Sequence, residues 1–147
     1  MNCIGILFQK GKNKFDKVHT ELPEAIAKAC KKKKVGHFVH LSALGVDTCS
    51  SKYAQSKLAG EKAVLKACKT ATVLRPSVVF GPEDNFFHMF AELSRYLPAL
   101  PLIGGGATKF QPVFVGDVAD AVIASFEKQS KVQGKVFELG GPDVVSF

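Results

Sequence analysis

The chain has 147 residues, of which 46% are apolar and 22% charged, and this composition fits one globular domain with a sizeable core. No apolar stretch approaches the roughly 20 residues that a membrane-spanning helix needs, and the first residues lack the basic region of a secretory signal. The formal net charge is +7, and part of it lies in Lys31–Lys34. Without interleaved aromatic residues, this run is more typical of a basic helix end than of a nucleic-acid interface.

The cysteines and histidines show no spacing that indicates a metal site or a disulfide framework. We therefore expect no metal, and we expect reduced, mostly buried thiols at the four cysteines, which are Cys3, Cys30, Cys49 and Cys68. His37 and His40 lie on opposite faces of one predicted strand, which favours packing or solvent roles for both. The absence of a G-x-S-x-G motif argues against a serine hydrolase.

Strands and helices alternate in the first half of the chain. The apolar pattern predicts a strand over 2–8, a helix over 14–33, a strand over 37–42, a helix over 52–69 and a strand over 71–75. The first helix carries an apolar stripe at a four-residue spacing, made of Val18, Leu22, Ile26 and Cys30. Pro23 should kink this helix or mark the start of its regular part. This order predicts a parallel sheet with crossover helices.

The second half is less regular. We expect a helix over 86–96, breaks at the prolines and at Gly104–Gly106, and an extended segment over Lys109–Val115. A helix over Asp117–Glu127 should follow, with Asp117 as its N-cap, and a strand over Lys135–Leu139 closes the pattern. From the patterns at both of its ends, we expect the chain to be part of a larger fold.

The most specific chemical signal is Tyr53-Ala54-Gln55-Ser56-Lys57, preceded by Ser42 at a predicted strand end. Tyr53 and Lys57 are four residues apart on a predicted helix, so both side chains share one face. A nearby ammonium should lower the pKa of the tyrosine and let it exchange a proton with a carbonyl or alcohol. In an open parallel sheet, ligands bind beyond the carboxyl ends of the strands, where Ser42 could reach the same oxygen.

With this order of strands and helices and this pattern of Ser42, Tyr53 and Lys57, the sequence resembles an atypical short-chain dehydrogenase/reductase of the NAD-dependent epimerase/dehydratase type. Within that family it is similar to the branch of the NAD(P)H-binding accessory subunit of respiratory complex I and its bacterial relatives. The segments that carry the resemblance are 2–5, 38–43, 53–57 with 60–61, 74–77, 80–84, 111–113 with 115–119, and 138–142. The family implies an α/β fold with a Rossmann-like, doubly wound parallel sheet.

The resemblance also implies roles for individual residues. Ser42, Tyr53 and Lys57 would be catalytic, with Tyr53 as acid/base and Lys57 also holding the nicotinamide ribose. The residues implied to border the cofactor are Asn2, Gly5, Tyr53, Lys57, Arg75, Pro76, Ser77, Val78 and Val79. Gln111 and Phe114 would face the substrate. Residues 1–82 would form the Rossmann-like part, and residues 83–147 part of a small, C-terminal, substrate-side region of the same domain.

One departure from the family concerns the cofactor. The family's fold begins with a strand and a Gly-rich turn that cradles the pyrophosphate, and no such turn follows an early strand here. Gly104–Gly106 precedes an extended segment and is no substitute. The residue that selects NAD or NADP is missing too, so the preference within NAD(P)(H) stays open. We expect this chain alone to bind dinucleotide poorly or not at all.

The sequence therefore predicts an NAD(P)H-dependent oxidoreductase that acts on a carbonyl, alcohol or quinone-type substrate. One alternative is a nucleotide-binding subunit without turnover that is associated with complex I. The other is a truncated product without independent activity. The expected partners are a dinucleotide, a small substrate and possible complex I subunits, and not nucleic acid. The expected location is the cytoplasm, or in a eukaryote the mitochondrial matrix and the periphery of the inner membrane.

Overall fold

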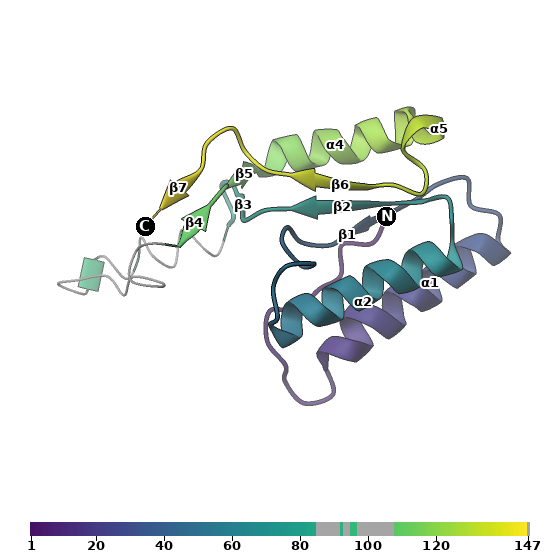
Figure 1. Ribbon diagram of the computed structural model, residues 1–147, viewed down its shortest axis with the longest axis horizontal. Coiled ribbons are helices and arrows are strands. Elements are labelled where there is room, and N and C mark those ends of the chain that lie inside the picture. Colours follow the sequence, from purple (N-terminus) through teal and green to yellow (C-terminus); the bar gives the residue numbers. More distant parts are fainter. Residues whose placement is uncertain (85–91, 93–94, 97–107, 147) are drawn as a thin grey trace.

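The computed structural model describes residues 1–84, 92, 95–96 and 108–146 (Figure 1). Apart from residues 92, 95 and 96, the helix predicted over 86–96 lies outside the described residues. The same is true of Gly104–Gly106 and Phe147.

A parallel three-stranded sheet forms the centre of the molecule. Its order is β1-β2-β6, with β1 at Phe38–Leu41, β2 at Ala71–Pro76 and β6 at Val136–Leu139. The register places Phe38 beside Ala71 and Pro76 beside Leu139. From Ala71 to Arg75, β2 is buried throughout, as expected for a central strand covered on both faces. The predicted α/β class and parallel sheet are thereby confirmed.

The strand predicted over 2–8 is wrong for most of its length. Only Asn2 pairs with the sheet, through a parallel bridge to His40. The Asn2 amide donates to the Val39 carbonyl at 2.8 Å, and the Leu41 amide donates to the Asn2 carbonyl at 3.0 Å. Beyond this bridge the chain leaves the sheet, and the side chains of Leu7 and Phe8 are exposed. The prediction of a buried strand here rested on apolar character alone, which does not show whether a segment is buried.

Helices cover both faces of the sheet (Figure 1). On one side lie α1 (Leu22–Lys32) and α2 (Lys52–Ala67), which pack on each other. On the other side lie α4 (Val115–Glu127) and the short α5 (Gln129–Val132). The core between the first pair of helices and the sheet contains Ala27, Phe38, Val64, Cys68 and Ala71. At the start of α2, the Ser51 hydroxyl accepts a hydrogen bond from the Ala54 amide, a typical N-cap.

The helix predicted over 14–33 forms in two parts. A π-helical turn, η1 (Asp16–Glu21), precedes α1, and Pro23 lies in the first turn of α1, where proline is tolerated. Pro23 therefore marks the start of the regular helix. The buried positions are His19, Pro23 and Ala27, one residue away from the predicted stripe. Of that stripe, Ile26 and Cys30 pack against the core, while Leu22 is exposed.

The segment after β2 forms two small sheets. β3 (Val79–Phe80) pairs in parallel with β5 (Val113–Phe114), and β4 (Lys109–Phe110) pairs antiparallel with β7 (Val145–Ser146). The extended segment predicted over Lys109–Val115 is confirmed up to Phe114. Helix α4 begins at Val115 with Phe114 as its N-cap residue, so the prediction of Asp117 as N-cap was wrong. Asp117 instead lies in the first turn, where a carboxylate suits the helix dipole.

The structure also tests two predictions about cysteines and histidines. Cys3 and Cys49 are exposed and only Cys68 is buried, so the prediction of mostly buried thiols was wrong. His37 and His40 do lie on opposite faces: His37 packs edge-on against Phe126 of α4, and His40 lies on the α2 side near Lys57. In the described part of the chain, no helix is both long and apolar enough to span a membrane.

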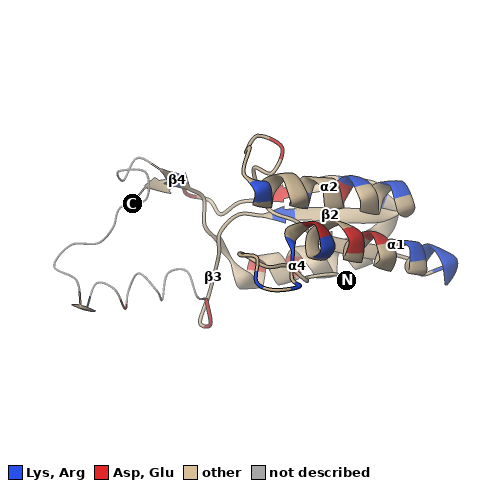
Figure 2. Cartoon of the chain, turned by 90° about the horizontal axis from the view of Figure 1, so that it is seen from below, with Lys and Arg blue, Asp and Glu red and all other residues tan. Residues whose placement is uncertain are grey.

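The lysine run lies at the carboxyl end of α1, as predicted for a basic helix end (Figure 2). Lys31 and Lys32 form the last turn of α1, where cations suit the helix dipole, and Lys33 is its C-cap residue. Since β1 begins only after this run, the run lies at the amino edge of the sheet.

Helix α2 approaches η1 so closely that only glycine fits at position 60. A Cβ atom at Gly60 would overlap the carbonyl oxygen of His19. Both partners are parts of a backbone, so neither can move aside cheaply. The close approach is what brings His19 onto the first turns of α2.

We therefore expect Gly60→Ala to lower the free energy of unfolding by about 1–3 kcal/mol, as overpacking does. Helix propensity alone predicts the opposite sign, a gain of up to about 1 kcal/mol. Urea unfolding of the variant measures the difference. The exposed neighbour Ala59→Gly serves as the control, with a loss of about 1 kcal/mol. Stabilisation by Gly60→Ala would contradict the close contact.

Candidate functional site

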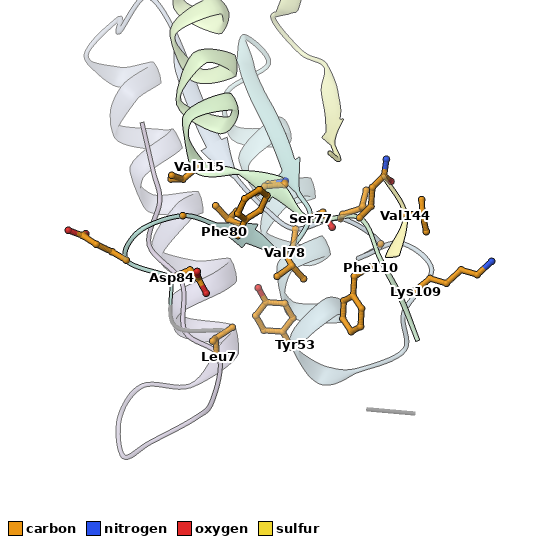
Figure 3. Close-up of a pocket in the computed structure, with 18 of the residues that line it drawn as sticks. Leu7, Tyr53, Ser77, Val78, Phe80, Asp84, Lys109, Phe110, Val115 and Val144 are labelled. Carbon is orange, nitrogen blue, oxygen red and sulfur yellow. The ribbon is translucent and has the colours of Figure 1, made fainter. Parts of the chain in front are cut away.

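A pocket with a volume of about 1210 Å³ lies at the carboxyl edge of the sheet (Figure 3). One wall is the loop after β1, at Ala43–Gly45, and another is the segment at the end of β2, Pro76–Phe80. Tyr53 closes it on the α2 side, and Phe110 and Gln111 line it from the second half of the chain. The position follows from the parallel sheet, because the loops after neighbouring strands meet at one edge.

The structure gathers half of the predicted site residues around this pocket and leaves the others outside it. The predicted residues that line the pocket are Tyr53, Pro76, Ser77, Val78, Val79 and Gln111. The predicted residues that do not line it are Asn2, Gly5, Ser42, Lys57, Arg75 and Phe114. The side chain of Gln111 donates to the Gly141 carbonyl at 2.8 Å. Phe114 is 43% exposed and packs on Phe80.

Tyr53 is half-buried in an aromatic cluster. Its ring meets the His19 ring edge-on with centroids 5.2 Å apart, and the Phe15 ring edge-on at 5.9 Å. Burial raises the pKa of Tyr53 above its ordinary value of 10.0. The expectation that Lys57 lowers this pKa was therefore wrong, because desolvation is the effect that dominates here. At neutral pH the Tyr53 hydroxyl keeps its proton.

Lys57 lies one turn further along α2, where it is buried, and its Nζ donates to the Leu41 carbonyl at 2.9 Å. Burial lowers the pKa of Lys57, while the negative charge of Glu61 opposes the shift. A Cβ atom at Gly5 would lie 4.0 Å from Nζ, so the Asn2–Gly5 segment borders this ammonium. The structure thus brings Gly5 and Lys57 together, and neither residue lines the pocket.

Two buried polar atoms on this face of the sheet have no hydrogen-bond partner among the described residues: Ser42 Oγ and His40 Nε2. Ser42 is 6% exposed, and its amide donates to the Leu74 carbonyl, which extends the ladder beyond β1. The Asn2 side-chain amide donates to His40 Nδ1 at 3.0 Å, while its carbonyl oxygen accepts from the Ile4 amide. Because Nδ1 accepts, the neutral ring carries its proton on Nε2. A buried hydroxyl without a partner is uncommon and is a point where a ligand could bind.

Arg75 is held by three carboxylates and does not offer its guanidinium to the pocket. Its Nε and Nη2 donate to Glu61 at 3.0 and 2.8 Å, and Nη1 donates to Asp47 at 2.6 Å and to Glu138 at 3.3 Å. The side chains of Arg75 and Glu61 are only 10% and 3% exposed. Glu61, and after it Asp47, raise the pKa of Arg75 above its ordinary value. The hydrogen bond from Arg75 in turn lowers the pKa of Asp47. Sequence reasoning had placed Arg75 along the cofactor and missed this cluster.

The comparison with protein families matches residues 9–140 to the NAD dependent epimerase/dehydratase family. This chain belongs to the NAD-dependent epimerase/dehydratase family. The resemblance seen in the sequence is thereby confirmed, and so is the assignment of a Rossmann-like fold.

Two curated relatives carry the same name, NADH dehydrogenase (ubiquinone) 1 alpha subcomplex subunit 9, mitochondrial. The protein from Arabidopsis thaliana is 37% identical over 146 residues, which are 98% of this chain and 36% of that protein. The protein from Rattus norvegicus is 39% identical over 145 residues, which are 97% of this chain and 38% of that protein. This family member therefore spans little more than a third of the length of these relatives.

Among solved structures, the chain is similar to UDP-glucuronic acid 4-epimerase from Bacillus cereus in complex with NAD. The TM-score is 0.80 at 22% identity, and the match covers 98% of this chain and 53% of the epimerase. At this identity the likeness concerns the fold alone.

The ion pair between Arg75 and Glu61 should dominate the stability of the site. Removing one partner of a buried pair costs about 3–5 kcal/mol. The carboxylates that Arg75 would keep, Asp47 and Glu138, have half-exposed side chains and compensate its charge only weakly. We expect Glu61→Gln to lower the free energy of unfolding by this amount in urea denaturation. Glu138→Gln is the matched control, because the Glu138 side chain is 56% exposed and its pairing is worth at most about 1 kcal/mol. Equal losses for both variants would contradict the assignment.

His40 should make the fold sensitive to acid. Burial, and then the positive charge of Lys57, lowers the pKa of His40 from 6.5 to about 4. Between these values the unfolded chain binds the proton and the folded chain does not, so stability falls as the pH falls. The shift corresponds to a loss of about 3 kcal/mol.

The comparison that isolates His40 is urea unfolding of the wild type and His40→Asn at about pH 7 and about pH 4. The Asn oxygen can still accept from Asn2 but does not titrate, so the variant should lose less stability on acidification. Identical losses in the two proteins would assign the acid sensitivity to other groups.

Proposed function

We propose that this chain carries the nicotinamide side and the substrate side of a dinucleotide site. The protein to which it belongs would be an NAD(P)(H)-dependent oxidoreductase for a carbonyl, alcohol or quinone-type substrate. The observation that carries the proposal is the position of Tyr53 in the pocket wall at the carboxyl edge of the sheet. Lys57 follows one turn along the same helix. Ser42, whose hydroxyl has no partner within the described residues, directly follows β1.

The residues present are suited to the nicotinamide half of such a cofactor. Val78 and Val79 offer an apolar wall for a flat ring, and Ser77 lies beside them in the same pocket. Only one acceptor for Lys57 Nζ, the Leu41 carbonyl, is found among the described residues, so this ammonium has further N–H groups for ribose hydroxyls. When bound, NAD(P)H would supply a hydride to the substrate.

The protonation state of Tyr53 favours reduction as the working direction. Because burial raises its pKa, the hydroxyl is protonated at neutral pH and can donate to the oxygen of a carbonyl substrate. Ser42 would donate a second hydrogen bond to the same oxygen. Gln111 would contribute to substrate contact on the opposite wall, held there by its bond to the Gly141 carbonyl.

A second candidate is a nucleotide-binding subunit of respiratory complex I without turnover. The complex I names of both relatives support it, and so does the lack of any lowering of the Tyr53 pKa by Lys57. In this case the protein would be mitochondrial and would lie at the periphery of the inner membrane among other subunits. The chain by itself would then be a part of a site, and we expect weak nucleotide binding by residues 1–147 alone.

Turnover by the longer protein to which we propose that this chain belongs, called the natural-length protein below, separates the two candidate functions. We expect NADH or NADPH oxidation with one or more members of a panel of carbonyl compounds and quinones. Tyr53→Phe should abolish this turnover and leave nucleotide affinity within about tenfold, or roughly 1.4 kcal/mol, as expected for the loss of one hydroxyl contact.

The exposed Tyr96 offers the matched control, since Tyr96→Phe removes the same hydroxyl away from the pocket and should change neither quantity. Unchanged turnover in Tyr53→Phe would refute the catalytic role of Tyr53. Saturable nucleotide binding without turnover on any substrate would favour the structural subunit.

A further inference from the structure

His19 occupies a buried position between two segments that the proposed function places next to the cofactor. It is 1% exposed and lies in η1, outside the pocket lining. The Ile6 amide donates to His19 Nε2 at 3.0 Å, which ties the imidazole to the N-terminal segment. His19 Nδ1 lies 2.9 Å from Ser56 Oγ, which ties it to the first turns of α2.

The hydrogen bonds fix one tautomer of this histidine. The Ser56 hydroxyl donates its only proton to the Tyr53 carbonyl at 2.7 Å, so it must accept from His19 Nδ1. Nε2 accepts from the Ile6 amide and therefore carries no proton. Only the neutral ring with its proton on Nδ1 makes both bonds, and burial and the nearby Lys57 lower the pKa of His19 accordingly.

The ring of His19 also packs directly on the site. It stacks on Phe15 with centroids 5.3 Å apart and meets Tyr53 edge-on at 5.2 Å. A Cβ atom at Gly5 would lie 3.7 Å from His19 Nε2 and 4.0 Å from Lys57 Nζ. The same imidazole therefore touches the segment that borders Lys57, the ring of Tyr53 and, through Ser56, the backbone of Tyr53.

We propose that His19 is a positioning residue of this site. Its neutral imidazole braces the segment Asn2–Ile6 against the Tyr53 turn of α2, so that Tyr53 and Lys57 keep a fixed relation to a bound nucleotide. This role rests on the proposed function, and it adds to the Ser42–Tyr53–Lys57 set a residue that touches neither the pocket nor the substrate.

Side-chain amides can replace the imidazole one nitrogen at a time. In His19→Asn the amide nitrogen falls where Nδ1 lies and keeps the donor to Ser56. In His19→Gln the amide oxygen falls where Nε2 lies and keeps the acceptor for Ile6. His19→Leu keeps the bulk and loses both bonds. A variant in the core of α1, Ala27→Gly, lowers stability away from the site and controls for stability alone.

Two readouts on the natural-length protein test the role. The first is the NADPH dissociation constant from nucleotide fluorescence, well below the unfolding temperature. The second is the ¹³Cζ resonance of Tyr53, assigned by its absence in Tyr53→Phe. We expect His19→Leu to weaken NADPH binding by at least about tenfold and to shift the Tyr53 resonance. His19→Asn and His19→Gln should each recover part of the affinity, and Ala27→Gly should change neither readout.

The outcomes separate this role from the proposed function. If the wild type binds neither NADPH nor, in the same assay, NADH, the proposed function fails, and the role of His19 fails with it. If the wild type binds while His19→Leu keeps both its affinity and the Tyr53 resonance, only the His19 role is overturned. A loss of affinity in Ala27→Gly as large as that in His19→Leu would also overturn it, because general stability would then explain the effect.

Discussion

The buried ion pair between Arg75 and Glu61 is the interaction on which the geometry of the site depends. Arg75 lies near the end of the central strand, and the residues that follow it, Pro76–Phe80, form one wall of the pocket. Glu61 lies on α2, one turn after Lys57 and two turns after Tyr53. Asp47 ties the loop after β1 to the same guanidinium. One cation thus fixes the relative positions of strand, helix and loop, and its own charge is satisfied away from the pocket.

The polar groups of the site divide between those that build it and those that remain available. Arg75, His19 and Gln111 are engaged with other parts of the chain. In the part of the chain that the structure describes, Ser42 Oγ has no hydrogen-bond partner, and Tyr53 carries a proton that it can donate. This division suits a site in which a few polar groups meet a ligand inside largely apolar walls. Lys31–Lys34 lie at the opposite, amino edge of the sheet. They contribute to the net charge and not to the site.

The sequence predicted the central sheet and its helices because their apolar periodicity is strong and local. Ser51 caps α2 and Pro23 opens α1, as local rules predict. The strand predicted over residues 2–8 was wrong because an apolar segment has the same pattern whether or not a neighbouring strand pairs with it. The prediction of Asp117 as N-cap was wrong because α4 begins two residues earlier, at Val115.

The site was predicted in part, for a physical reason. Tyr53 and Lys57 stand four residues apart on one helix, and that relation is visible in the sequence. The contacts of Arg75 with Glu61 and Glu138 join residues 14 and 63 positions apart, and His19 meets Ser56 across 37 positions. Such pairs depend on how helices and strands pack, so spacing does not reveal them. The rise in the pKa of Tyr53 likewise depends on burial, which the spacing of two residues along a helix does not reveal.

Hydrogen–deuterium exchange of the longer protein, with and without NADPH, shows whether the nucleotide binds at the carboxyl edge of the sheet. We expect slower exchange in the presence of NADPH over residues 42–57 and 77–80, with no change at Lys31–Lys34. Saturable NADPH binding without protection of either segment would contradict this location, because the nucleotide would then lie away from the carboxyl edge of the sheet.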